Sequence, residues 1–168
     1  MVLLQCAKGG AGINKLSYHS GLRKEMFSRL GSALLKGRLM GCLIYIGEGD
    51  THSFELADNW ESTFKELINE IIDFAEDKEI PFIFAQLSNI EDSRKLRKKH
   101  AYKAWDYLKD IQKNIFIKNI SMVYTDDLEL KDDGIHLKTK SQKELAKRFY
   151  EAYKTSIFYK KILLSNHR

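Results

Sequence analysis

Residues 39–47, which read Leu39-Met40-Gly41-Cys42-Leu43-Ile44-Tyr45-Ile46-Gly47, carry the clearest strand signal in the sequence. The apolar residues follow one another without the polar alternation of a half-buried strand, and Gly47 ends the run. A short continuous run of this kind is typical of a parallel strand that is covered on both faces. We therefore expect a strand over residues 39–46 inside a parallel sheet.

The flanking sequence alternates between further strand signals and helical periods. Strands are predicted over Val2–Ala7, over Phe82–Leu87 directly after Pro81, and over Ile120–Tyr124. Apolar residues at helical spacing predict helices over residues 22–35, 60–74, 93–111 and 141–153. This alternation predicts one α/β domain with a parallel sheet over residues 1–153, followed by a basic tail at residues 154–168.

Composition and charge exclude several classes of protein. The 168 residues are 43% hydrophobic and 30% charged, and no apolar run approaches the roughly 20 residues of a membrane-spanning helix. The net charge of +5 comes from lysines spread along the chain, and the densest basic run, Arg94–His100, resembles the solvated face of a helix. We therefore predict no membrane contact, and nucleic acid as an unlikely partner.

Cysteine and histidine spacing predicts neither a disulfide framework nor a metal site. Cys6 and Cys42 lie far apart in apolar surroundings, and the histidines have no ligand spacing with cysteines or acids. No cofactor or metal is therefore expected. No signal peptide is visible, so the cytoplasm is the default compartment.

Candidate functional residues gather where the predicted strands end, which is where ligands bind in parallel sheets. Asp133-Gly134-Ile135-His136 follows the last strand, and an Asp three residues before a His can fold its carboxylate onto one ring nitrogen. The other nitrogen would then be free to accept a proton from a nucleophile. Taken alone, the same residues also fit an ordinary turn.

Two glycine-rich turns add further candidates. Gly47-Glu48-Gly49-Asp50 brings a carboxylate to the end of a strand, and Ala7-Lys8-Gly9-Gly10-Ala11-Gly12 could present backbone N–H groups to an oxyanion. The second turn matches neither a Walker loop nor a dinucleotide fingerprint. The alternative for both is a plain turn with solvated acids.

The order of these blocks resembles the SGNH hydrolases, and within them the carbohydrate acetylesterases that include sialate O-acetylesterase and acetylxylan esterases. The matching residues are Gly9-Gly10-Ala11, Gly41, Gly47-Glu48-Gly49-Asp50, Pro81-Phe82, Gln86-Leu87, Trp105, Gln112, Asp133-Gly134-Ile135-His136-Leu137, Thr139 and Gln142. The resemblance implies a three-layer α/β/α flavodoxin-like fold. It also implies Asp133 as the orienting acid, His136 as the general base, and Gly10, Gly47 and Glu48 at the oxyanion and substrate.

The sequence departs from that family in two places. The family's Gly-Gln-Ser-Asn block, with its nucleophilic serine, belongs upstream of Gly9, and no serine here has an equivalent setting. The family's oxyanion-binding Gln is Ile46, which cannot donate a hydrogen bond. We therefore expect an N-terminally truncated sheet that lacks the first strand and exposes an edge, so that association into a homo-oligomer or with another partner is one outcome.

Three functions remain open on this basis. The first is a carbohydrate O-acetylesterase-like serine hydrolase whose substrate is an acetylated carbohydrate, inactive alone without the serine block. The second, favoured by Ile46, is a non-catalytic relative that binds a glycan or a protein. The third, a nucleic-acid-associated domain, depends on charge alone.

Overall fold

The structure is a computed structural model that describes residues 2–90 and 102–165, with residues 159–165 as backbone only. The elements follow one another as a short 3-10 helix η1 and the helices and strands of an α/β domain. In chain order they are η1 (Ile13–Leu16), α1 (Gly21–Leu34), β1 (Cys42–Tyr45), η2 (Glu48–His52), α2 (Phe54–Asp58), α3 (Trp60–Ala75), β2 (Phe82–Ala85), α5 (Trp105–Asn114), β3 (Ile120–Val123) and α6 (Thr139–Ser165).

The described strands form one parallel sheet in the order β1-β2-β3. Ile44 pairs with Phe84, and Phe84 with Met122, so equivalent residues lie side by side across the sheet. All three strands were predicted from the sequence, and the helices between them supply the crossovers that parallel pairing requires. The carboxyl ends of the strands therefore meet at one edge.

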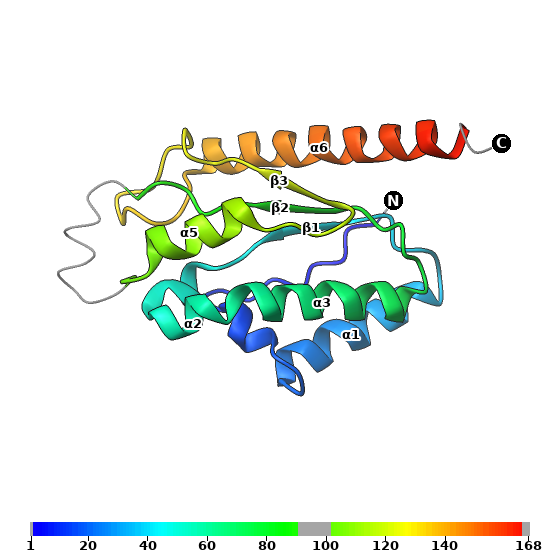
Figure 1. Cartoon of the computed structure of the whole chain (residues 1–168), viewed down its shortest axis with the longest axis horizontal. Coiled ribbons are helices and arrows are strands. Elements are labelled where there is room, and N and C mark those ends of the chain that lie inside the picture. The colour runs from blue at the N-terminus through cyan, green and yellow to red at the C-terminus, as the bar shows by residue number, and fades with distance from the viewer. Residues whose placement is uncertain (1, 91–101, 166–168) are drawn as a thin grey trace.

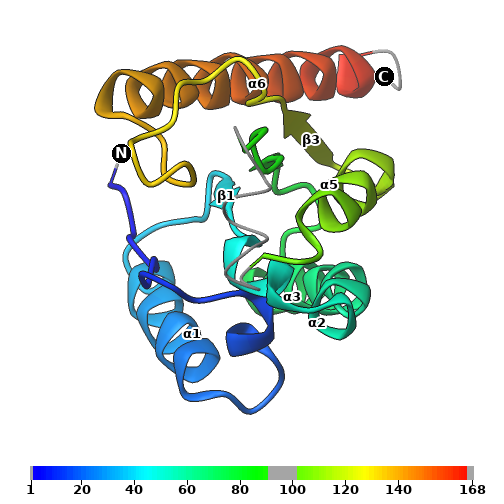
Figure 2. The ribbon, with the colours of Figure 1, turned by 90° about the vertical axis from the view of Figure 1, so that its left-hand side faces the viewer.

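Helices cover both faces of the sheet, which confirms the three-layer α/β/α arrangement (Figure 1). On one face, Phe82 and Phe84 of β2 are buried in the same cluster as residues of α3 and α5. On the other face, Ile83 and Ala85 are buried with residues of α6. Figure 2 shows α6 alone above the sheet, with α1 and α3 below it. The side-chain alternation of β2 thus divides the core in two.

Helix α3 is the main support of the larger core. Trp60, Phe64 and Ile68 are fully buried at helical spacing, and Trp60 stacks on Phe64 with their ring centroids 4.5 Å apart. The helix ends at Glu76, which takes the left-handed conformation with φ 51°. The first residue of α3, Trp60, packs directly against the turn at Gly47.

The predicted strand over Val2–Ala7 is wrong. These residues belong to no strand, and the side chains of Val2 and Leu3 are 93% and 84% exposed. The apolar pattern does favour a strand, but an extended segment becomes one only when a neighbour satisfies its backbone groups. Among the described residues no such neighbour lies beside it.

The predicted helices differ from the structure mainly at their ends. The last helix, expected over residues 141–153, begins at Thr139 and continues to Ser165. The division between a domain ending at 153 and a tail from 154 therefore stays a prediction, although one helix runs across it. Of the helix predicted over 93–111, the structure describes α5, whereas residues 93–101 lie outside the described residues.

Candidate active site

Asp133 and His136 form the pair that the sequence predicted. Oδ2 of Asp133 lies 2.8 Å from Nδ1 of His136, while Oδ1 accepts hydrogen bonds from the backbone N–H groups of Ile135 and His136, both at 2.9 Å. Gly134 adopts φ 73°, which gives the chain the tight path between them. These contacts hold the pKa of Asp133 down to about 2, with the hydrogen bond from His136 as the largest cause.

Glu48 faces the other nitrogen of the same imidazole. Its Oε2 lies 3.7 Å from Nε2 of His136, a distance that is within the range of an ion pair but too long for a hydrogen bond. Burial is the largest influence on the pKa of Glu48 and raises it, whereas the charge of His136 lowers it. The structure thus brings Glu48, Asp133 and His136 together at the carboxyl edge of the sheet.

Tyr102 and Tyr45 stand close to this cluster and escaped the sequence analysis. The pKa of Tyr102 is raised by burial and by the charges of Glu48 and Asp133. The pKa of Tyr45 is raised to about 12, chiefly by burial and then by Glu48. Tyr45 could have been suspected because it is the last but one residue of a predicted strand, two residues before Gly47. No pattern in the sequence singles out Tyr102.

Gly47 is required at its position by its surroundings. It adopts φ 138°, and a Cβ placed on it would lie 2.9 Å from Nε2 of Gln112 and 3.3 Å from Nε1 of Trp60. Gln112 is fully buried, donates from Nε2 to the carbonyl of Ile46 at 3.1 Å and accepts from the N–H of Leu87 at 2.9 Å. Gln112 therefore ties the ends of β1 and β2 together and fixes the turn that carries Glu48.

Asp50 anchors the N-terminal glycine turn beside Glu48. Its side chain is fully buried and accepts hydrogen bonds from the N–H groups of Ile13 at 2.6 Å and Asn14 at 3.2 Å. A Cβ on Gly12 would lie 2.4 Å from Oδ1 of Asp50, so only glycine allows this approach. The alternative that this turn carries only solvated acids is therefore wrong for Asp50.

Gly10 lies in the turn just before this anchor. It adopts φ 71° and is exposed, and the N–H of Ala11 donates to the carbonyl of Lys8 at 3.2 Å. Through Gly12 and Asp50 this turn is attached to η2, the element that begins at Glu48. The described contacts do not join Gly10 directly to Glu48 or His136, so its place at an oxyanion stays a prediction.

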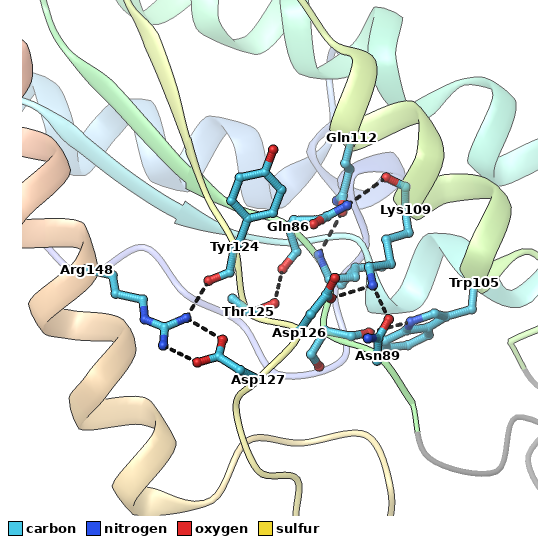
Figure 3. Close-up of polar contacts among 12 residues, drawn as sticks. Gln86, Asn89, Trp105, Lys109, Gln112, Tyr124, Thr125, Asp126, Asp127 and Arg148 are labelled. Carbon is cyan, nitrogen blue, oxygen red and sulfur yellow. Dashed lines mark hydrogen bonds and ion pairs between the residues drawn. The ribbon is translucent and has the colours of Figure 1, made fainter.

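The loop of residues 124–138, which carries Asp133 and His136, is held from both sides (Figure 3). The guanidinium of Arg148 in α6 donates two hydrogen bonds, of 2.7 and 2.6 Å, to the carboxylate of Asp127. It also donates one to the carbonyl of Tyr124. Lys109 of α5 lies 2.5 Å from Oδ1 of Asp126. Two neighbouring aspartates thus attach the start of the loop to two different helices.

A backbone turn closes the other end of the same loop. The N–H of Lys131 donates to the carbonyl of His136 at 2.7 Å, and Leu130 and Leu137 form an antiparallel bridge. Leu137 is 4% exposed and belongs to the core beneath α6. Because both ends of the loop are held by these contacts, the backbone that carries the imidazole of His136 is fixed in position.

The position of the expected oxyanion-binding Gln is occupied by Ile46, whose side chain packs against the larger core. Only its carbonyl takes part in the polar network, as the acceptor from Gln112. Residue 46 therefore supplies no side-chain donor. Within residues 2–90 and 102–165, no serine hydroxyl forms a hydrogen bond with His136, and no group of histidine, cysteine and acidic residues has the arrangement of a metal site.

The helices of the described ranges contain none that is long and apolar enough to cross a membrane. A shallow hollow of about 590 Å³ lies between β3 and α6, lined by residues such as Tyr124, Glu144 and Arg148. It contains none of the residues around His136. We therefore take the cluster at the strand ends, rather than this hollow, as the candidate active site.

Comparison with known proteins gives similarity at the level of the fold and of the family. No curated protein matches the chain. The crystal structure of a protein from Arabidopsis thaliana is similar, with a TM-score of 0.76 at 24% sequence identity. The match covers 89% of this chain but 59% of that chain, so the likeness concerns the fold.

A protein-family model identifies the family directly. The model described as "Carbohydrate esterase, sialic acid-specific acetylesterase" matches residues 1–155, which is nearly the whole chain and includes every residue of the cluster. With the parallel sheet, the Asp133–His136 pair and this match in hand, the chain belongs to the sialic acid-specific acetylesterase family of carbohydrate esterases.

Proposed function

We propose that this chain forms the acid–base part of an O-acetylesterase site that acts on acetylated carbohydrates through a serine supplied from outside the described residues. The observation that carries the proposal is the 2.8 Å contact between Oδ2 of Asp133 and Nδ1 of His136. That contact fixes the tautomer in which Nδ1 carries the proton and Nε2 can accept one. Glu48, at 3.7 Å, leaves Nε2 without a hydrogen bond of its own.

The proposed reaction is an acyl transfer in two steps. His136 Nε2 takes the proton of the serine hydroxyl while the serine oxygen attacks the acetyl carbonyl carbon, and the protonated imidazole then gives that proton to the departing sugar oxygen. Water next attacks the acetyl-serine with its proton passing to His136, and acetate leaves as the serine oxygen recovers the proton. The carboxylates of Asp133 and Glu48 stabilise the imidazolium that forms between these transfers.

The developing oxyanion needs donors that residue 46 cannot supply. The exposed turn at Gly10 supports the proposal that its backbone N–H takes this role, because the turn is attached through Asp50 to the element that begins at Glu48. Gly47 lies within the fixed turn at the same sheet edge. Loss of one side-chain donor typically costs about a hundredfold in rate, so a site with Ile46 would be slower than one with a donor there.

An experiment with an added peptide tests the proposal. The chain is assayed on an aryl acetate and on O-acetylated sialic acid, alone and with a synthetic peptide that ends an apolar strand in Gly-Gln-Ser-Asn. We expect little turnover by the chain alone, and turnover with the peptide that disappears when its serine is alanine or when the chain carries His136→Ala. His52→Ala is the matched control because His52 packs against the ring of Tyr102 rather than Asp133.

Two outcomes would count against this proposal. Robust turnover by the chain alone, abolished by His136→Ala, would place the nucleophile inside the chain and remove the need for an external serine. Absence of turnover while the serine peptide is bound would remove the acyl-transfer role. A serine-directed phosphonate labels only the peptide in the active complex if the proposal holds.

A non-catalytic binding role is the second candidate. Ile46 favours it, because this residue offers the site only a carbonyl that Gln112 already occupies. In that case the cluster of Glu48, Asp133 and His136 would bind an acetylated glycan or a protein without cleaving it. Calorimetric titration with O-acetylated sialic acid separates the two roles, since binding without acetate release in the presence of the serine peptide supports the second.

A further inference from the structure

Two large aromatic side chains are exposed where α2 meets the first part of α5. Phe54, the first residue of α2, is 54% exposed, and Tyr107 in α5 is 42% exposed. Their ring centroids lie 5.5 Å apart with an angle of 61° between the ring planes, which is an edge-to-face arrangement. In such a pair the edge of one ring covers one face of the other, so the remaining ring faces are open to another molecule.

A carboxylate completes this surface. The hydroxyl of Tyr107 donates to Oδ1 of Asp58 at 2.5 Å, and Asp58 is exposed at the end of α2. The same hydrogen bond raises the pKa of Tyr107, so the phenol keeps its proton and remains the donor. Oδ2 of Asp58 forms no hydrogen bond with any other described residue. We call Phe54, Asp58 and Tyr107 together the aromatic platform.

The two helices of the platform are joined through their backbones. The N–H of Ala104, the residue before α5, donates to the carbonyl of Thr51 in η2 at 2.9 Å. Within α5, Trp105 and Leu108 are buried, so Tyr107 between them is directed outward. The platform is therefore carried by fixed helices, and its rings need no rearrangement to meet a ligand.

The platform lies near the candidate active site. Element η2 begins at Glu48, which faces His136, and α2 follows η2 directly. With a rise of about 2 Å per residue in a 3-10 helix and at most about 3.5 Å in extended chain, Phe54 lies no more than about 15 Å from Glu48. Figure 1 shows α2 and the start of α5 at the end of the sheet where the loop that carries His136 also lies. A ligand of several sugar units can span both places.

We propose that the aromatic platform binds a neutral sugar ring that neighbours the acetylated sugar in an oligosaccharide substrate. The faces of a sugar ring carry C–H groups that pack on aromatic rings, and its hydroxyls donate hydrogen bonds to carboxylates. Phe54 and Tyr107 supply the packing, and Asp58 accepts from a sugar hydroxyl. That the same ligand also carries the acetyl group rests on the proposed function, whereas binding of the neutral ring can be measured without any serine.

The chemistry of the platform selects this ligand over two others. A carboxylate accepts hydrogen bonds but has none to donate, so a sialic acid at this position would bring a second negative charge next to Asp58. A specific protein partner needs about 800 Å² of surface on each side. Two aromatic side chains of roughly 150–250 Å² each, about half of it exposed, offer far less than that.

Titration with neutral trisaccharides tests the proposal. The full chain, labelled with ¹³C in its aromatic rings, is titrated with xylotriose and with cellotriose and followed by NMR. A disaccharide of sialic acid is the charged comparison. We expect the ring signals of Phe54 and Tyr107 to shift with a neutral trisaccharide, and the sialic acid disaccharide to bind about threefold more weakly or worse.

Substitutions within the platform have matched controls. Phe54→Ala removes a packing face and should weaken the trisaccharide by about fivefold, whereas Phe54→Tyr keeps the ring and should change binding by less than about twofold. Phe116→Ala, at a residue outside the platform that is 89% exposed, should leave binding unchanged. Asp58→Asn keeps an acceptor for Tyr107 but removes the charge, so it should reduce the preference for neutral sugars. Thermal melting checks each fold.

Three results would overturn the inference. They are no binding of either trisaccharide, binding by Phe54→Ala that is as tight as binding by Phe54→Tyr, and a sialic acid disaccharide that binds as tightly as the neutral sugars. Failure of the proposed function gives a different result: the trisaccharides bind at the platform, but O-acetylated xylotriose is not turned over with the serine peptide. Where turnover occurs, Phe54→Ala should raise KM and leave kcat unchanged, because Phe54 would contact only the neighbouring sugar.

Discussion

The carboxylate of Asp133 contacts His136 twice, through Nδ1 of the ring at 2.8 Å and through the backbone N–H at 2.9 Å. One side chain thus orients both the imidazole and the turn that carries it. A ring held in this way keeps its other nitrogen directed away from the turn, toward Glu48. The arrangement can be tested without any assay of activity, because it leaves a signature in the titration of Asp133.

We predict that His136→Ala raises the pKa of Asp133 from about 2 toward its ordinary value of 3.8, because the hydrogen bond from the His136 side chain is the largest cause of the low value. Carboxyl ¹³C shifts followed by NMR give this pKa directly. His52→Ala is the control and should leave it unchanged. A value that stays near 2 in His136→Ala would show that the backbone N–H groups alone hold the carboxylate.

Gly47→Ala should lower the free energy of unfolding by about 1 to 3 kcal/mol, through a strained positive φ and a Cβ that crowds Gln112 and Trp60. Urea denaturation followed by circular dichroism measures the change. Gly37→Ala is the matched control, because nothing lies within 4 Å of its added Cβ. If both substitutions have equal effects, the turn at Gly47 is more adaptable than its contacts indicate.

The three strands and the supporting helices could be predicted because each signal was local. The helical stripe of Trp60, Phe64 and Ile68 is fully buried, as its spacing predicts. The apolar run at residues 39–46 correctly predicted strand β1, but the expectation that it is covered on both faces is wrong, because β1 is the end strand of the described sheet and Leu43 is 51% exposed. Val2–Ala7 has an equally apolar pattern, yet strand formation depends on a partner that the local sequence cannot reveal. Helix α6 was underestimated because its continuation past Tyr153 lacks a clear apolar period.

The site was predicted where the chemistry is close in sequence and missed where it is distant. Asp133 and His136 are three residues apart, so their contact follows from one turn. Glu48 lies far from both in sequence; its position after a predicted strand made it a candidate, but its approach to His136 is set by the pairing of the strands in the sheet. Tyr102 is near Glu48 and Asp133 through tertiary packing alone. Gln112 matched a family residue, but its role in joining the ends of two strands needed coordinates.

Asp50 gives a pH-dependent prediction. Burial is the main cause of its raised pKa, so the folded state binds the proton more tightly than the unfolded state does. The stability contributed by this proton is present at low pH and is lost as pH rises from 3.8, the ordinary value, through the raised pKa. Asp50→Asn should therefore flatten this decline in the free energy of unfolding, measured by urea titration at several pH values.

Two further variants complete this test. Asp110→Asn, at an exposed position, controls for the general effect of an added amide. Asp50→Ala leaves the N–H groups of Ile13 and Asn14 without their acceptor and should cost about 2 to 3 kcal/mol at neutral pH. A decline with pH that is the same in Asp50→Asn and wild type would assign it to another buried acid, for which Glu48 is the first candidate because burial also raises its pKa.

The paired hydrogen bonds between Arg148 and Asp127 give the last prediction. Two parallel hydrogen bonds require the planar guanidinium, and they are the main cause of the low pKa of Asp127, about 2. Arg148→Lys keeps the positive charge but cannot form the two parallel hydrogen bonds, so the pKa of Asp127 should rise toward 3.8. The amides of Gly134 and His136 should also exchange faster with solvent, because α6 no longer holds the start of their loop.

NMR titration and hydrogen exchange on the same sample measure both effects. Lys147→Ala is the control, because Lys147 neighbours Arg148 on α6 and shares its ion-pair partner Glu144, at 3.5 and 3.6 Å, whereas the hydrogen bonds to Asp127 come from Arg148. Faster exchange at His136 in Arg148→Lys alone would establish Arg148 as a positioning residue for the imidazole. If Asp127 titrates near 3.8 while His136 exchanges as in wild type, then Lys109 and the backbone turn are sufficient to hold the loop, and the contact of Arg148 serves only to join α6 to the end of β3.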